Sequence, residues 1–292
     1  LVYLTGGLGN QMFQLAAAFS ANKKSQSIIR IDCELGKPRN NGMNPDLFDF
    51  LLPRNIEIFD KKTSFLTSKT AGFLLRMGVS PRKWETISSI SRLLGLGAKL
   101  ILFTRYRKFV TLTVGRDVGF SKIIWNQNTI QIGYFQSFKY LEDMDVYGEM
   151  EKIEPKEKNL KLESLIEKAL SENPIFVHFR FQDYLHHDHF GIPSPRYYEK
   201  AISCLGGDRR KIWVFSDDQV EAKKVFPKVF EKNAYFVEDE SLSPAQVLHL
   251  LRFGSDYVIA NSTFSWWGAQ LDRKSTRLNS SHANISYAVF CL

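Results

Sequence analysis

The sequence predicts an α/β protein of two domains, the second of which is a doubly wound parallel sheet. Three observations lead to this prediction. Four short apolar runs alternate with helical segments in the second half of the chain. The 292 residues, 44% hydrophobic and 24% charged, suffice for two buried cores and do not fit a disordered or fibrous chain. No apolar run reaches the roughly 18 residues that a membrane-spanning helix needs.

The alternation begins at LKLESLIEKALSE (160–172), where one helical face carries Leu162, Leu165, Ile166 and Leu170. Ser243 followed by Pro244 is typical of a helix N-cap and first helical position. The strands that we expect are the apolar runs 175–179, 211–215, 235–239 and 256–260. The helices that we expect between them are 195–204, 219–226 and 244–253, with one more after Ser265.

The first half opens with a strand, a glycine turn and a helix, VYLTGGLGNQMFQLAAAF, and we expect the helix to begin near Asn10. Gly6, Gly7 and Gly9 allow a ligand to approach the backbone closely. Met12 stands where a dinucleotide-binding GxGxxG pattern has its third glycine, so a nicotinamide-dependent hydride-transfer enzyme is a weak alternative. We expect an N-terminal α/β domain over residues 1–155 and a second domain over residues 156–271.

The formal net charge of +8 is concentrated in residues 61–124, which contain 13 Lys and Arg residues against two acids, Glu85 and Asp117. Leucine, phenylalanine and isoleucine are interspersed with these cations. The mixture suits peripheral contact with a membrane surface or an anionic partner, and it fits a solvated helical face equally well. No nucleic-acid-binding motif accompanies the charge, so we expect no nucleic-acid partner.

Both ends of the chain are unusual. Leu1 opens directly into a strand-like run, so we expect the chain to start inside a longer protein. Residues 272–292 read like a translated sequencing adapter, and we treat them as a non-native tail. The two cysteines before that tail, Cys33 and Cys204, slightly favour a reducing cytosol.

Polar residues follow the ends of three expected strands. They are His178, Arg180 and Asp183 after the first strand, Ser216, Asp217 and Asp218 after the second, and Asn261, Ser262 and Thr263 after the fourth. Ligands of open parallel sheets bind beyond the carboxyl ends of the strands. The sequence therefore predicts one site, assembled from three separate segments, at this edge of the second sheet.

The residue types at that edge indicate a nucleotide or a nucleotide sugar. Small hydroxyl side chains before a helix are typical of a phosphate site, because the first turn of a helix offers backbone N–H groups. Arg180 adds a planar donor fork that matches phosphate oxygens. A carboxylate would repel phosphate but can accept from a guanine amino group or a sugar hydroxyl. The hydroxyl side chains are Ser262, Thr263 and Ser265, and the carboxylates are Asp217 and Asp218.

Four sequence motifs point to a specific family of nucleotide-sugar enzymes. In chain order they are GGLGNQMFQLA, HFRFQD, FSDD and NSTFSWWGA. From Leu1 to about Leu271 the chain resembles the α-1,2-fucosyltransferase family of glycosyltransferases. The resemblance implies a two-domain type-B glycosyltransferase architecture. It also implies an inverting transfer of L-fucose from GDP-L-fucose to the 2-hydroxyl of a β-galactoside, with no metal and no cofactor. The acceptor would be a β-galactoside-terminated glycan or a lipid-linked oligosaccharide.

The resemblance implies roles for individual residues. The family pattern H-x-R-R-x-D matches His178, Arg180 and Asp183. His178 would help to hold guanine, and Arg180 would hold the β-phosphate and stabilise its charge during transfer. Asp183 would act as the general base or would orient Arg180. The resemblance also implies that Asp217 or Asp218 holds the guanine edge. It implies that the diphosphate is held by Ser262, Thr263 and Ser265. The residues of the first domain that would face the cleft are Gly7, Gly9, Asn10 and Gln11.

Two departures from the family pattern affect the expected activity. Phe181 stands where the pattern has its second arginine. Since side chains alternate along a strand, Arg180 shares a face with His178 while Phe181 points away, so we still expect GDP-fucose binding but slower turnover. The family chain also continues past the WWGA helix with another strand. We therefore expect a sheet that is truncated at its end.

Other interpretations remain open. The loop LHHDHFG (185–191) is either a metal site or a polar loop over the cleft, and the second fits better because such close loop histidines seldom all reach one ion. The chain could use another nucleotide-sugar donor, or it could bind a nucleotide or carbohydrate without catalysis. We expect a cytoplasmic protein, peripheral to the inner membrane. A Golgi location behind a lost anchor is the alternative.

Overall fold

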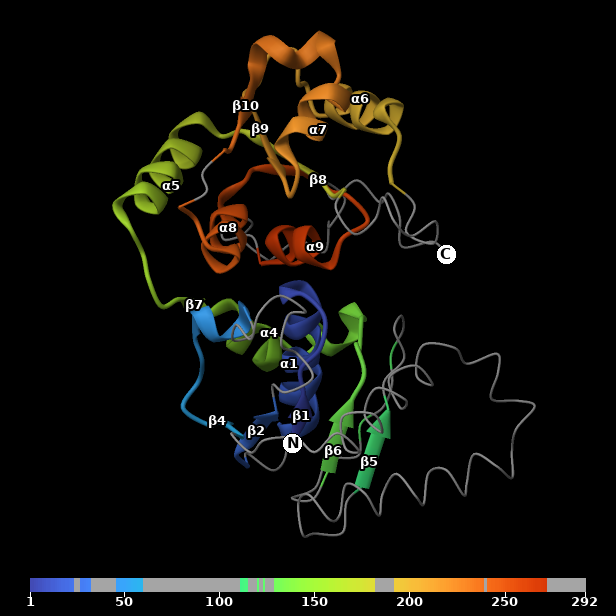
Figure 1. The fold of residues 1–292 in the computed structure, drawn as a ribbon, viewed down its shortest axis with the longest axis vertical. Coiled ribbons are helices and arrows are strands. Elements are labelled where there is room, and N and C mark those ends of the chain that lie inside the picture. Colours follow the sequence, from blue (N-terminus) through green and yellow to red (C-terminus); the bar gives the residue numbers. More distant parts are fainter. Residues whose placement is uncertain are drawn as a thin grey trace, which may run out of the picture. The chain divides into compact units, whose positions relative to one another are not determined.

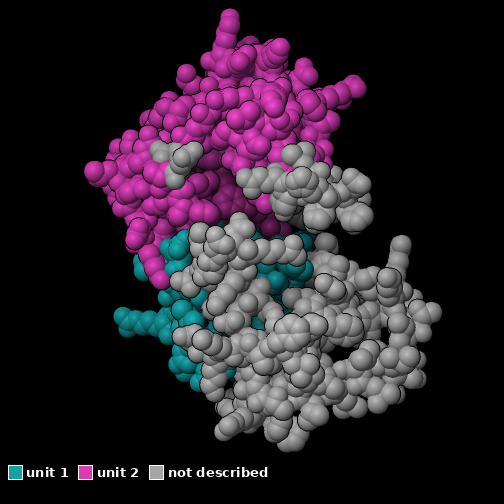
Figure 2. All heavy atoms as spheres, in the orientation of Figure 1, with its two compact units in different colours: residues 1–154 teal, residues 155–292 magenta. Residues whose placement is uncertain are grey.

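The computed structural model describes residues 1–23, 27–32, 46–59, 111–114, 120, 123, 129–181, 192–238 and 241–271. The chain divides into two compact units, Leu1–Glu154 and Pro155–Leu292, which Figure 2 colours separately. Most of the basic segment 61–124, the loop 185–191 and the tail 272–292 lie outside the described residues. No helix in the described ranges is long and apolar enough to cross a membrane.

The first unit is built on a parallel sheet. Within the described residues its strands lie in the order β4–β2–β1–β6–β5, namely Ile56–Ile58, Ile29–Asp32, Val2–Tyr3, Thr129–Ile132 and Thr111–Val114. Helix α1 (Leu8–Asn22) is buried along most of its length, and α4 (Met144–Glu151) packs beside it (Figure 1). The remaining short elements are η1 (Asp46–Asp49), β3 (Phe50–Leu51) and η3 (Phe138–Leu141).

The glycine turn after β1 is shorter than the sequence predicts. Helix α1 begins at Leu8 with Gly7 as its N-cap, so Gly9 lies inside the helix and not in the turn. Gly6 has a positive φ of 73°, and a Cβ atom there would lie 2.6 Å from Asn10 Nδ2. The side chain of Gln14 bonds both backbone groups of Thr5, accepting from its N–H at 3.0 Å and donating to its carbonyl at 3.1 Å. The Gln14 side chain therefore satisfies both backbone groups of the residue that precedes the turn.

The second unit is the predicted doubly wound sheet. Its strands lie in the order β10–β9–β8–β11, namely Ala234–Phe236, Ile212–Ser216, Ile175–Phe179 and Asp256–Val258, and every pair of neighbours is parallel. The helices are α5 (Leu160–Glu172), α6 (Pro195–Cys204), α7 (Gln219–Val225), α8 (Pro244–Leu250) and α9 (Thr263–Gln270). The short elements are η5 (Lys228–Asn233) and η6 (Leu251–Phe253), and β7 (Glu154–Pro155) lies at the boundary between the two units.

Alternation along β8 separates two cores, one on each face of this sheet. Phe176 packs with Leu162 of α5 and Leu250 of α8. Val177 packs on the other face with Ile202 of α6 and Ala222 of α7. Both faces are thus covered by helices (Figure 1), which explains why the strand reads as a continuous apolar run.

Most predicted boundaries in the second unit are confirmed. Helices α5 and α6 match the expected ranges 160–172 and 195–204, and Ser243 forms a capping box with Gln246. Strand β10 ends at Phe236 and not at residue 239, because the Glu238 N–H turns back to the Phe236 carbonyl at 3.0 Å. Strand β11 likewise ends two residues before the predicted end at residue 260.

A polar cluster joins the amino ends of three strands of the second sheet. Arg210, just before β9, donates from Nη1 to Asp256 Oδ2 at 2.6 Å and from Nη2 to the Asn173 carbonyl at 3.1 Å. Its Nη2 also donates to the Ser255 hydroxyl. The Arg210 and Asp256 side chains are 27% and 15% exposed. This guanidinium therefore has a structural role at the edge opposite the predicted site.

Candidate functional site

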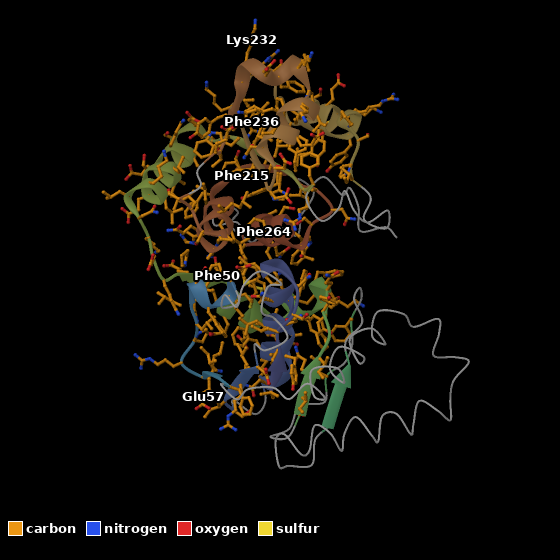
Figure 3. All side chains as sticks on the ribbon, in the orientation of Figure 1. Phe50, Glu57, Phe215, Lys232, Phe236 and Phe264 are labelled. Atoms are coloured by element: carbon orange, nitrogen blue, oxygen red, sulfur yellow. The ribbon has the colours of Figure 1, made fainter. Side chains whose placement is uncertain are left out.

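The carboxyl ends of β8, β9 and β11 bring the predicted site residues to one edge of the second sheet. The parallel register pairs Phe179 with Ser216, and Val258 with Val177. Arg180 comes directly after β8, and Asp217 comes directly after the neighbouring strand β9. The segment 261–263 follows the third strand and leads into α9, whose second residue, Phe264, is labelled in Figure 3.

Arg180 and Asp217 form an ion pair at this edge. Arg180 Nη1 lies 3.1 Å from Asp217 Oδ2, and the two side chains are 30% and 12% exposed. Asp217 Oδ1 accepts a hydrogen bond from the Phe181 N–H at 2.9 Å. The carboxylate therefore engages both the side chain and the backbone of the turn that follows β8.

Asp218 and Ser216 build the turn between β9 and α7. Asp218 is the N-cap of α7, and its Oδ1 accepts from the Glu221 N–H at 2.9 Å. The Ser216 hydroxyl donates to the Asp218 carbonyl at 2.9 Å and accepts from the Asp218 N–H at 3.0 Å. The FSDD string thus contains an ordinary helix-capping turn as well as the carboxylate that pairs with Arg180.

His178 is a buried, neutral imidazole. It is 6% exposed, and its ring centroid lies 5.8 Å from that of Phe264. Burial, and secondarily the charge of Arg180, lowers the pKa of His178 from 6.5 to about 3. Nδ1 has no hydrogen-bond partner among the described residues. At neutral pH this side chain therefore adds hydrogen-bonding atoms to the site but no positive charge.

The buried histidine predicts an acid-sensitive fold. The pKa of His178 is about 3 in the folded chain and 6.5 in the unfolded chain. Between pH 3 and pH 6.5, therefore, the imidazole binds a proton only when the chain is unfolded. The contribution of His178 to the free energy of unfolding is complete above pH 6.5 and should fall by about 1.4 kcal/mol per pH unit below it. Urea unfolding between pH 6.5 and 5 should show a steeper loss in the wild type than in His178→Asn. Equal slopes would contradict the assignment.

Helix α9 starts earlier than the sequence predicts. Ser262 is its N-cap and accepts from the Phe264 N–H at 3.3 Å, so Thr263 and Ser265 lie in the first turn and not before the helix. The buried Ser265 hydroxyl donates to the Ser262 carbonyl at 3.2 Å. The early start follows from this capping serine. It places the positive end of the helix dipole beside the carboxyl end of β11.

Phe181 is part of the core, as strand alternation predicts. It is 3% exposed and packs in the apolar cluster that contains Phe179, Tyr198 and Phe226. The rings of Phe181 and Phe179 are stacked with centroids 5.9 Å apart, and Phe179 stacks on Tyr198 at 4.0 Å. The residue that replaces the second arginine of the family pattern therefore anchors the turn that carries Arg180.

The predicted residues of the first unit surround the turn after β1. Asn10 Oδ1 accepts from Gln136 Nε2 at 2.8 Å. Gln11 is buried and uses both ends of its amide, donating to the Gly6 carbonyl at 2.8 Å and accepting from the Leu47 N–H at 3.0 Å. Sequence reasoning missed Gln136, because nothing local marks a partner 126 residues away. Gln11, which we expected to face the cleft, thus uses its side-chain amide to bond the backbone of Gly6 and Leu47.

Two of the expected site features fall outside the described residues. They are Asp183, the candidate base, and the histidine-rich loop 185–191. No group of three or more His, Cys, Asp or Glu side chains suited to a metal ion occurs within the described ranges.

Known proteins similar to this chain are glycosyltransferases. The family model of Glycosyl transferase family 11 matches residues 100–284, more than half of the chain, and this match includes residues 272–284 of the tail. An α-1,2-colitosyltransferase from Escherichia coli is 27% identical over 276 residues, covering 92% of this chain and 86% of that protein. The O-antigen biosynthesis glycosyltransferase WbnK, also from Escherichia coli, is 25% identical over 298 residues, covering 92% and 89%.

The fold is similar to that of the fucosyltransferase NodZ from Bradyrhizobium, in the crystal structure of its selenomethionine form. The TM-score is 0.50 at 13% sequence identity, over 91% of this chain and 90% of that one. At this identity the similarity concerns the fold alone. It confirms the α/β, type-B glycosyltransferase-like architecture that the sequence predicts.

Proposed function

The chain belongs to glycosyl transferase family 11, and on that premise we propose that it transfers L-fucose from GDP-fucose to the 2-hydroxyl of a β-galactoside. The observation that carries the proposal is the grouping of Arg180 with the start of α9 at the carboxyl edge of the second sheet. A guanidinium and a helix N-terminus are both suited to a diphosphate. The α-1,2 linkage in the name of the colitosyltransferase supports the proposed position of transfer.

The proposed mechanism is an inverting displacement. The bond between fucose C1 and the β-phosphate oxygen breaks while the acceptor hydroxyl attacks C1 from the opposite face, so the electron pair leaves with GDP. Negative charge grows on the diphosphate as this happens, and Arg180 stabilises it without a metal ion. Asp183 would take the proton of the attacking hydroxyl. The reaction leaves an α-1,2-linked product, free GDP and one proton.

The similarity to a colitosyltransferase supports a second candidate donor. Colitose lacks one ring hydroxyl of fucose, so the two donors differ by a single hydrogen-bonding group. A site that binds that hydroxyl discriminates strongly against its absence, whereas an apolar site tolerates either sugar. Comparing the two donors at equal concentration therefore identifies the sugar.

The experiment is a transfer assay with the full chain, GDP-fucose and a β-galactoside, with chelator present. We expect an α-1,2-linked fucoside by NMR, and no product when the acceptor is the matching 2-deoxygalactoside. Product from a colitose donor alone would select the second candidate. Product on the 2-deoxy acceptor would contradict the proposed linkage, and dependence on added metal would contradict the mechanism.

A further inference from the structure

The structure points to a positioning role for one of the two acids that follow β9. Resting on the proposed function, we propose that Asp217 holds the Arg180 guanidinium in place for the donor diphosphate and does not contact the guanine base. Arg180 would touch the donor, and Asp217 would act through it.

The two oxygens of Asp217 have different partners on one turn. Oδ2 lies 3.1 Å from Arg180 Nη1, and Oδ1 accepts from the neighbouring Phe181 N–H at 2.9 Å. One carboxylate thus accepts a hydrogen bond from the backbone of the turn and forms an ion pair with the side chain that the turn carries. A long arginine side chain has many rotamers, so a second anchor at its head group keeps it in one orientation.

Asp217 is itself held firmly. It sits between Ser216 and Asp218, whose mutual hydrogen bonds at 2.9 and 3.0 Å close the turn into α7. On the other side Phe181 is buried in the aromatic cluster with Phe179. Neither the carboxylate nor the turn that it grips can shift without disturbing packed residues, which is the condition for orienting a neighbour.

A base-reading role fits this geometry less well. To hold a guanine edge, a carboxylate must present both oxygens to the two adjacent N–H donors of the base. In Asp217 one oxygen accepts from the backbone, and Oδ2 has almost no solvent-accessible surface. The Arg180 side chain is by contrast 30% exposed, and its fork has five N–H donors in all. The exposed partner of the pair is the one able to meet a phosphate.

The test compares ligands that differ by the β-phosphate. Calorimetric titration of GDP and GMP should be run on the wild type, Asp217→Asn, Arg180→Ala and the double variant. The asparagine keeps an acceptor for the Phe181 N–H but removes the charge that holds Arg180. We expect GDP affinity to fall by about ten-fold in Asp217→Asn, with GMP affinity unchanged and no further loss in the Arg180→Ala background. Glu221→Gln, on helix α7, is the matched control for loss of a nearby acid and should bind GDP like the wild type.

Two outcomes would overturn the assignment. Equal losses for GMP and GDP would make Asp217 a base contact, and additive losses in the double variant would show that it acts independently of Arg180. Should Asp217→Asn fail to fold, Asp217→Glu is the second variant: the added methylene moves the carboxylate from its position beside Arg180, so the same selective loss of GDP affinity is expected. Failure of the proposed function looks different: the wild type itself would then show no preference for GDP over UDP.

Discussion

Replacing Phe181 with arginine, which restores the family pattern, is expected to destabilise the second unit and not to improve donor binding. Phe181 lies in the apolar cluster on the side of β8 away from His178. An arginine at this position would be packed against aromatic rings. A buried charge without a partner costs about 3–5 kcal/mol. Since whole domains are stable by only about 5–15 kcal/mol, most of the stability should be lost.

Urea unfolding of Phe181→Arg measures this effect directly. Phe181→Leu is the control, because it keeps an apolar side chain and should cost no more than about 1–2 kcal/mol. A folded Phe181→Arg variant of wild-type stability with tighter GDP binding would mean that position 181 faces the ligand. The packing described here would then be wrong at that residue.

Arg180→Lys should lower the transfer rate by about 10²–10³ while leaving the fold nearly as stable as the wild type. Lysine keeps the charge but presents a single ammonium in place of a planar fork, so it cannot serve Asp217 and a diphosphate with fixed geometry. The side chain is partly exposed, so little buried surface changes. Steady-state kinetics with GDP-fucose and a β-galactoside measures the loss.

Arg210→Lys is the matched control for that substitution. Arg210 belongs to the same sheet but lies at the opposite edge, where it bonds Asp256 and the Asn173 carbonyl. It should lower the free energy of unfolding and leave the rate per folded molecule unchanged. A comparable loss of rate in both variants would mean that Arg180→Lys lowers the rate by disturbing the fold and not by removing a contact with the donor.

The second unit was largely predictable from sequence because its signals are local. Apolar runs bounded by proline and by capping serines identify β8, α6 and α8. Two of the errors occur where a single hydrogen bond decides the boundary. The Ser262 cap starts α9 early, and the bond from the Glu238 N–H shortens β10. Nothing in the apolar pattern records either bond.

Partners across the sheet could not be read from the sequence. The pairing of Arg180 with Asp217 depends on the register of β8 against β9, and that of Asn10 with Gln136 joins residues 126 positions apart. Residue types alone indicated that a carboxylate would bind the guanine base and that an arginine would bind the phosphate. They could not indicate that the two side chains meet each other.

We propose that the carboxyl edge of the second sheet binds a guanosine diphosphate. Thermal unfolding of the full chain with GDP, GDP-fucose, UDP or NAD, with chelator present, tests it most directly. A ligand at 100 times its dissociation constant stabilises a fold by about 2.7 kcal/mol, a readily measured shift. We predict stabilisation by GDP and GDP-fucose, and none by UDP or NAD at the same concentrations. A stably folded chain that responds to no guanine nucleotide would contradict binding of GDP at this edge.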